Sequence, residues 1–260
     1  MIQIKDILNE LEALAPLPLQ EGFDNAGVQV GDVNQATTGA FVCLDVTESV
    51  VDEAIAKGCN LIISHHPLAF KPFKSLTGRT YIERCLMKAC KHDLVIYSAH
   101  TNLDNAVGGV NFKLAELIGL QNVRILSPHE DEYAGSGIVG DLLESEEAES
   151  FLLRIKKLLK AGCIKHSSLT GKPIRRVAVC GGSGAFLIPE AIALGADVFI
   201  TGEARYNDYY DVEDKILLAV AGHYETEICT KDIFSTLISK KFPTFAVHFT
   251  NVNSNPVKYL

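Results

Sequence analysis

Two stretches that lie far apart in the sequence follow the same pattern: a helical segment, a glycine, an apolar run and then side chains that bind metals. A second apolar run in each copy ends in a histidine that is followed four residues later by a carboxylate. The repeat predicts two related lobes that bring imidazoles and carboxylates to one shared metal site. The matching pairs are Glu53 with Glu190, Gly58 with Gly195, Ser64 with Thr201, His100 with His223, and Asp104 with Glu227.

Short apolar runs alternate with longer helical patterns along the chain, which predicts an α/β fold. We expect helices at 4–15, 50–57, Tyr81–Lys91 and Val110–Ile118, and strands at 40–46, Leu61–Ser64, 94–98 and 175–180. The expected architecture is an internal duplication: two related α/β lobes, 1–124 and 125–260, with mixed sheets flanked by helices and a central metal cleft. The acidic run at 144–149 is expected to form the solvated face of a helix.

Composition narrows the class of protein. The chain has 260 residues, of which 47% are hydrophobic and 22% charged, which is typical of a globular protein. Its net charge of −8 argues against general nucleic-acid binding, which requires a basic surface. No apolar run approaches the roughly 20 residues that span a bilayer, and the first residues lack the apolar core of a signal peptide. Seven cysteines without a C-x-x-C pair indicate a reduced, cytoplasmic protein.

The doublet His65-His66 follows a buried strand and precedes Pro67. Adjacent residues on a regular strand point to opposite faces, so the two imidazoles can serve one site only if the backbone turns at the strand end. Ligands gather at the carboxyl ends of strands in α/β sheets, which favours one imidazole on each of two close metals. The alternative is a pair of capping or surface histidines.

The segments from His100 to Asp104 and from His223 to Glu227 also follow buried strands. If each segment begins a helix, its histidine and its carboxylate share one face and can converge on one ion. Imidazole and carboxylate together suit Zn, Fe, Mn or Co rather than Ca or Mg. The alternative for either segment alone is an ordinary loop histidine beside a helix cap.

Three further segments are candidates for the same cleft. Glu203 occupies the place in the second copy that His66 has in the first, and Asp24 or Asn25 is expected to reach the site from a turn-rich segment. The run Cys180-Gly-Gly-Ser-Gly fits a phosphate cradle or a tight strand-to-helix turn, and the turn is favoured because the Lys of a P-loop is missing. Four histidines are assigned structural roles: His92, His129, His166 and His248.

Together these motifs resemble the dinuclear metal-centre proteins labelled GTP cyclohydrolase 1 type 2 homologues, also called NGG-interacting factor 3-like (NIF3-like). The resemblance covers nearly the whole chain. It rests on the segments that begin at Asp24, Ser64, Ala99, Gly108, Cys180, Thr201 and Ala221. Many relatives have a histidine where this chain has Asn207, and longer relatives insert a middle domain for which residues 125–175 are too few.

The resemblance implies two divalent metal ions per subunit and a ring-like homohexamer. The implied metal ligands are His65, His66, Asp104, His223 and Glu227, with Glu227 as the bridge between the ions. The leading functional hypothesis is metal-dependent hydrolysis of a nucleotide or similar small anion, in which His100 and Glu203 move protons as catalytic residues. The alternatives are a non-catalytic metal-bound scaffold or regulator of other proteins, and a binuclear phosphoesterase.

Overall fold

The computed structural model describes residues 2–130 and 133–260. The chain divides into two compact units, and both are discontinuous in sequence. The first unit comprises Met1–Leu103 and Thr230–Pro256, and the second comprises Asp104–Cys229 and Val257–Leu260. The lobes expected from the sequence, 1–124 and 125–260, are continuous, and that division stays a prediction.

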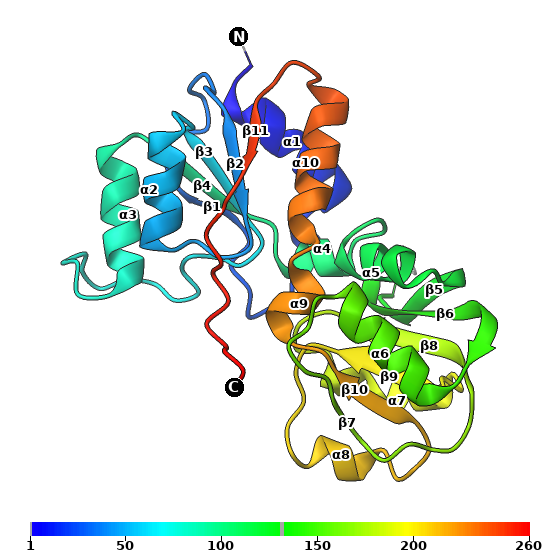
Figure 1. Cartoon of the computed structure of the whole chain (residues 1–260). Helices are drawn as coiled ribbons and strands as arrows, with labels where there is room; N and C mark the ends of the chain where they lie inside the picture. The colour runs from blue at the N-terminus through cyan, green and yellow to red at the C-terminus, as the bar shows by residue number, and fades with distance from the viewer. Residues whose placement is uncertain (1, 131–132) are drawn as a thin grey trace. The chain divides into compact units, whose positions relative to one another are not determined.

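The first unit is built on a five-stranded mixed sheet in the order β1-β4-β3-β2-β11 (Figure 1). Neighbouring strands from β4 to β11 are parallel, and β1 runs antiparallel to β4 at one edge. The strands are β1 (Gly27–Val30), β2 (Ala40–Cys43), β3 (Leu61–Ser64), β4 (Val95–Ser98) and β11 (Val247–Phe249). Every residue of β2, β3 and β4 is buried, because helices cover both faces of these central strands.

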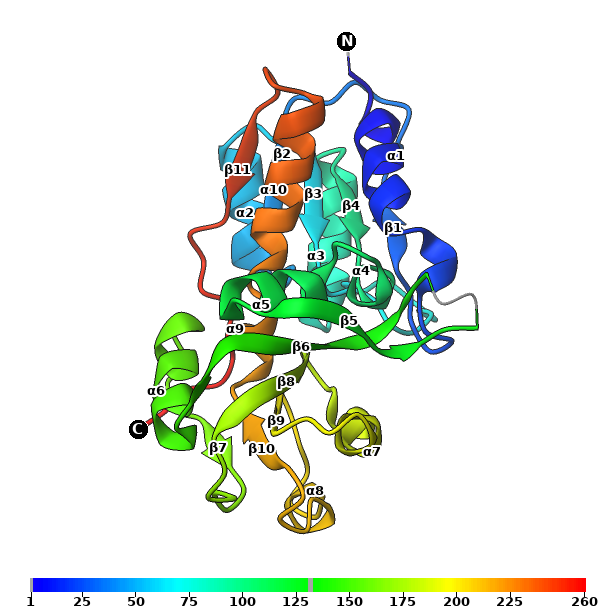
Figure 2. The same cartoon turned by 90° about the vertical axis from the view of Figure 1, so that its right-hand side faces the viewer.

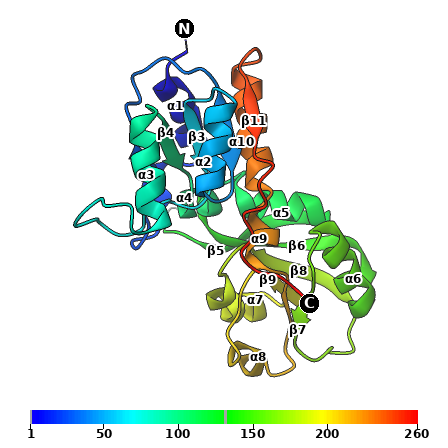
Figure 3. The ribbon, with the colours of Figure 1, turned by 60° about the vertical axis from the view of Figure 1, so that its left-hand side comes forward.

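Two helices cover each face of this sheet. Helices α2 (Glu48–Ala56) and α3 (Tyr81–Lys91) lie on one face, and α1 (Ile4–Leu14) and α10 (Thr230–Lys241) lie on the other (Figures 1 and 3). The core beneath α2 and α3 joins Phe41, Ile62 and Ile96 of the strands to apolar side chains of both helices. The short helix η1 (Leu17–Leu19) follows α1. The sequence therefore folds locally as expected around the strands that end in candidate ligands.

The second unit contains a six-stranded mixed sheet in the order β5-β6-β8-β9-β10-β7. Strands β8, β9 and β10 are parallel, and β5, β6 and β7 are antiparallel to their neighbours. The strands are β5 (Gln121–Pro128), β6 (Gly135–Glu146), β7 (Lys165–His166), β8 (Ile174–Cys180), β9 (Val198–Thr201) and β10 (Leu217–Val220). The helices are α5 (Val110–Ile118), α6 (Ala148–Leu158), η2 (Ala185–Leu187), α7 (Ile188–Ala193), α8 (Asp208–Asp211) and α9 (His223–Glu227).

Helices also flank both faces of this second sheet, and α6 and α7 lie on opposite sides of it (Figure 2). Helix α5 packs on β6 and β8, whereas Leu187, Ile188 and Ala191 from η2 and α7 join the core on the other face. The short helix α4 (Thr101–Asn105) crosses the boundary between the units along the chain. Among the described residues, no helix combines the length and the apolar character that crossing a membrane requires.

The observed elements confirm the mixed α/β class and most of the expected segments, but the stretch between α5 and β8 differs. The acidic run at 144–149 does not lie on one helix, because β6 continues to Glu146 and α6 begins only at Ala148. Each unit contains three consecutive parallel strands, with Cys43, Ser64 and Ser98 in register in the first and Cys180, Thr201 and Val220 in the second. The duplication behind this likeness stays a prediction.

Candidate metal centre

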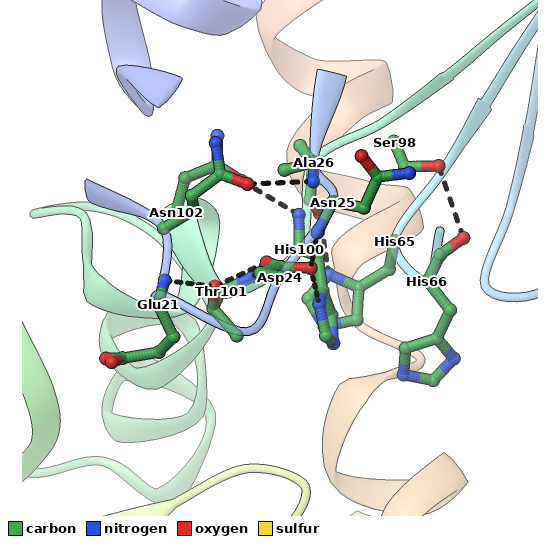
Figure 4. A network of polar contacts seen from close by, with 12 residues as sticks. Glu21, Asp24, Asn25, Ala26, His65, His66, Ser98, His100, Thr101 and Asn102 are labelled. Carbon is green, nitrogen blue, oxygen red and sulfur yellow. Dashed lines mark hydrogen bonds and ion pairs between the residues drawn. The ribbon is translucent and has the colours of Figure 1, made fainter. Parts of the chain in front are cut away.

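Three histidines of the first unit lie together at the carboxyl ends of neighbouring parallel strands. Ser64 of β3 is in register with Ser98 of β4, so His65 and His66 emerge beside His100 (Figure 4). The ring centroids are 5.0 Å apart for His65 and His66, 5.2 Å for His65 and His100, and 5.4 Å for His66 and His100. One nitrogen from each ring lies within 4.8 Å of the others, a spacing compatible with binding the same ion.

The backbone leaves the strand at the doublet. The N–H groups of both His65 and His66 donate to the carbonyl of Leu44, at 3.2 and 3.0 Å. The Ser64 hydroxyl donates to the carbonyl of His66 at 2.9 Å. This turn removes the strand alternation that would send adjacent side chains to opposite faces. The two imidazoles therefore stay close to each other, as the sequence pattern predicted for a strand end.

Each of the three imidazoles uses Nδ1 for a short hydrogen bond to a protein acceptor. Nδ1 of His65 lies 2.8 Å from the carbonyl of Ala99, Nδ1 of His66 lies 2.7 Å from Oδ1 of Asp45, and Nδ1 of His100 lies 2.8 Å from Oδ1 of Asp24. Because these oxygens only accept, Nδ1 carries the proton in the neutral ring and Nε2 keeps its lone pair. Imidazoles that ligate metals show this arrangement, in which the second nitrogen donates to a carboxylate or carbonyl.

Asp24 anchors His100 within a network that α4 helps to form (Figure 4). Its carboxylate accepts hydrogen bonds from the Thr101 N–H at 3.1 Å, from the Thr101 hydroxyl and from the Asn25 N–H at 2.7 Å. Burial raises the pKa of Asp24, but the hydrogen bonds to His100 and Thr101 outweigh it and hold that pKa at about 2. Asp24 thus reaches the histidines as an ionised group, whereas the Asn25 amide donates to the carbonyl of Ala69.

The second unit gathers its own donors around α9. Gly222, at φ +106°, precedes the helix, which begins at His223 and places Glu227 one turn later. Nε2 of His223 lies 3.0 Å from Oε2 of Glu227, and Nδ1 lies 3.0 Å from Oε1 of Glu203. A carboxylate oxygen of Asp104 lies within 4.8 Å of one of Glu227. The predicted ligands of this unit, together with Glu203, therefore form one cluster.

The glycine-rich run after β8 forms a tight turn against this cluster. Gly182 has φ +59°, and a Cβ at this position would overlap the carboxylate of Glu227. The Gly182 N–H donates to the Thr226 hydroxyl at 3.1 Å, and the Ser183 hydroxyl donates to Glu203 at 2.7 Å. The run therefore shapes the space around the candidate ligands.

Two supporting residues were given no role of their own in the sequence analysis. Asp45 is the second residue after β2, as His66 is the second residue after β3. Because it falls inside the strand expected at 40–46, a carboxylate just after a buried strand was missed. Asn111 joins two segments of the second unit: its amide donates to the carbonyl of Asp104 at 3.0 Å, and its oxygen accepts from the Gly181 N–H at 2.9 Å. Burial, followed by the charges of Asp104 and Glu227, raises the pKa of the nearby Cys180 thiol.

Comparison with known proteins identifies the family of this chain. The family model described as Duf34/NIF3 (NGG1p interacting factor 3) matches residues 2–256. The chain belongs to this family. Proteins named "GTP cyclohydrolase 1 type 2 homolog" are similar over most of their length: one from Clostridium acetobutylicum is 34% identical over 87% of this chain and 85% of its own, and one from Clostridium perfringens is 35% identical over 87% of each.

A solved structure agrees with the architecture. The crystal structure of the Staphylococcus aureus hypothetical protein SA1388 superposes with a TM-score of 0.92 at 28% identity and covers 99% of both chains. The resemblance inferred from the motifs is thereby confirmed, as is the mixed α/β fold. The donor types in the clusters, imidazole and carboxylate, fit divalent transition metals, and the histidine tautomers of the first unit fit metal ligation.

Proposed function

We propose that this protein binds two divalent transition-metal ions and uses them to hydrolyse a small anionic substrate of the nucleotide class. One observation carries the proposal: the Nδ1 atoms of His65, His66 and His100 are each held by an acceptor, with one ring nitrogen from each of the three imidazoles within 4.8 Å of the others. Orienting the imidazoles in this way costs side-chain entropy. Binding of metal by His65 and His66 would offset that cost, and His100 would stand beside the ions without being needed to hold them.

The second unit supplies the remaining donors of the proposal. His223, Glu227 and Asp104 are the ligands that the family resemblance implies, and two of them are fixed on one turn of helix. We propose that both donor sets take part in one dinuclear centre, a proposal that the repeat and the family resemblance support. When bound, such a pair of ions lowers the pKa of water and neutralises developing negative charge.

Two residues are assigned to proton transfer. His100 is held through Nδ1 by the ionised Asp24, so its imidazole is oriented for accepting or releasing a proton at Nε2. Glu203 lies beside His223 with its side chain 59% exposed, which leaves it accessible to a substrate. Their roles are distinguishable from ligation, because a variant of a proton carrier keeps its metal and loses turnover.

The substrate class rests on two features. Relatives carry the name GTP cyclohydrolase 1 type 2 homolog, and the loop between β3 and α3 presents an aromatic ring with adjacent positive charges. The Phe70 ring lies 5.5 Å from the His100 ring, edge to face, and the residue is 47% exposed. Lys71 and Lys74 on the same loop are exposed. A base that stacks on Phe70, with phosphates near the lysines, fits this composition.

The test uses protein stripped of metal by a chelator and reloaded separately with Zn²⁺, Mn²⁺, Fe²⁺ and Co²⁺. Incubation with GTP should give a ring-opened product, seen by mass spectrometry and by the change in purine absorbance. His65→Ala should abolish turnover, whereas His166→Ala, an exposed histidine on β7, should behave like the wild type. His100→Ala should retain the metal and lose turnover.

Other outcomes would replace the proposal. Release of inorganic phosphate from GTP without ring opening would identify a binuclear phosphoesterase. Fully metal-loaded protein that turns over neither the ring nor the phosphates would favour the non-catalytic scaffold.

A further inference from the structure

The segment that follows β11 runs back along the first unit and is attached to α2. The Thr250 hydroxyl donates to Glu53 at 2.8 Å, and the Asn251 side-chain amide donates to the same carboxylate at 2.7 Å. The Asn251 N–H adds a hydrogen bond at 3.1 Å. These contacts join residues nearly two hundred positions apart in sequence. They fix the start of the segment, so its later residues have a defined position relative to the sheet.

Ser254 in this segment contacts the carboxylate that holds a candidate metal ligand. The Ser254 hydroxyl donates to Oδ2 of Asp45 at 2.6 Å. The other oxygen, Oδ1, lies 2.7 Å from Nδ1 of His66. Asp45 is therefore held between a serine and a histidine, with one oxygen for each. All three residues belong to the first unit.

The two hydrogen bonds have different consequences. The bond to Nδ1 selects the His66 tautomer whose Nε2 has a lone pair for binding a metal, and it orients the ring. The Asp45 side chain is 31% exposed, so water competes for its oxygens and an unsupported carboxylate would sample several rotamers. The Ser254 bond restricts that rotation. His65 needs no such support, since its Nδ1 is held by the backbone carbonyl of Ala99.

We propose that Ser254 and Asp45 are positioning residues for His66, so that the segment after β11 helps to orient a ligand of the proposed metal centre. The inference rests on metal binding as proposed above. Neither residue touches the ion in this scheme: Ser254 orients Asp45, and Asp45 orients the imidazole and fixes its proton on Nδ1.

The first measurement is the affinity for Zn²⁺, determined by competition with a chromophoric chelator. Asp45→Ala should weaken binding about 10–100-fold, the effect typical of removing such a partner. Ser254→Ala should weaken it by a smaller factor, and Ser254→Thr, which keeps the hydroxyl, should restore it. Thr250→Val is the matched control, because it removes a hydroxyl that anchors the same segment to Glu53 without contacting Asp45. That variant should bind Zn²⁺ like the wild type.

The second measurement needs no metal. Long-range ¹H–¹⁵N correlation spectra of the metal-free protein report which ring nitrogen of His66 carries the proton. The wild type should show protonated Nδ1, Asp45→Ala a mixture of tautomers, and Ser254→Ala a shift in the same direction. A merely structural role for Ser254 would lower stability without changing this signature.

The outcomes separate the inference from the proposed function. Wild-type protein that binds none of Zn²⁺, Mn²⁺, Fe²⁺ and Co²⁺ would overturn the metal proposal and this inference with it. Tight binding by the wild type, with equal affinity and an unchanged His66 tautomer in Ser254→Ala and Asp45→Ala, would overturn the inference alone. Equal losses in Ser254→Ala and Thr250→Val would also overturn it, because anchoring of the segment would then explain the effect.

Discussion

Gly182 shows at the scale of one residue how closely the second-unit donors are packed. Its backbone has φ +59°, and a Cβ would overlap the Glu227 carboxylate. Only glycine meets both conditions, since other L-residues pay about 1–2 kcal/mol for the left-handed conformation. Glycine at position 182 therefore leaves the space that the Glu227 carboxylate occupies.

Replacement of Gly182 by alanine should thus do two things. Gly182→Ala should destabilise the fold by about 1–2 kcal/mol through backbone strain, and it should lower the metal content by displacing Glu227. Gly195→Ala is the control, because Gly195 has a similar φ of +67° with nothing within 4 Å of its added Cβ. Urea unfolding and elemental analysis of both variants separate the effects. Equal metal content in the two variants would contradict the packing argument.

Phe70 and Phe73 offer a matched pair for the substrate proposal. Both lie on the loop after the histidine doublet, at 47% and 41% exposure, and Phe70 contacts the His100 ring. Phe70→Ala should raise the KM for a nucleotide substrate about 5–150-fold, the range expected for the loss of about 1–3 kcal/mol of base stacking. Phe73→Ala should leave KM near the wild-type value. Metal content should not change in either variant, and a loss of metal in Phe70→Ala would contradict a role in substrate binding.

At the scale of elements, Glu83 connects α3 to the loop that carries Phe70. Its carboxylate accepts from the N–H groups of Thr77 and Arg79 at 2.7 and 3.2 Å, and from the Thr77 and Thr80 hydroxyls at 3.0 and 3.3 Å. Thr80 caps the same helix by accepting from the Glu83 N–H, which completes a capping arrangement. The hydrogen bond from the Thr77 N–H, together with those from the Arg79 N–H and the two threonine hydroxyls, lowers the pKa of Glu83 to about 2.

This depressed pKa predicts the pH range in which Glu83 stabilises the protein. Its contribution is complete above the ordinary carboxyl pKa of about 4.5 and is lost as the pH falls toward about 2. Glu83→Gln should lower Tm by a few degrees at pH 7, and the difference from the wild type should shrink between those two pH values. Glu147→Gln, which removes a carboxylate that caps only its own helix, should cost less. A Tm difference independent of pH would contradict the assignment.

The elements that the sequence predicted are those with strong local signals. Strands β2, β3 and β4 are short runs of residues buried on both faces, and Thr47 and Thr80 mark the helix starts with caps. Strands β5 and β6 escaped because their apolar residues are interrupted by polar ones. β5 is an edge strand with largely exposed positions, and the end of β6 carries glutamates. They form strands because β5 pairs with β6 and β6 pairs with β8, and the local sequence does not indicate this pairing.

At the scale of the whole molecule, the chain leaves the first unit after Leu103 and returns to it at Thr230. The return could not be inferred from the sequence, because β11 joins the first sheet by pairing with β2 and the two strands are about two hundred residues apart. For the same reason the sequence did not reveal that Ser254 contacts Asp45. The candidate ligands were predictable from motifs, whereas the residues that orient them depend on the tertiary fold. The hexamer expected from the family resemblance stays a prediction.

The central claim is that both donor sets bind metal, and metal stoichiometry tests it most directly. Elemental analysis should find two divalent ions per chain in metal-replete wild-type protein and in His166→Ala. If the donor sets form one dinuclear centre, the double variants His65→Ala/His66→Ala and His223→Ala/Glu227→Ala should each fall well below one ion per chain while remaining folded. Two ions retained in either double variant, or none in the wild type, would contradict the account.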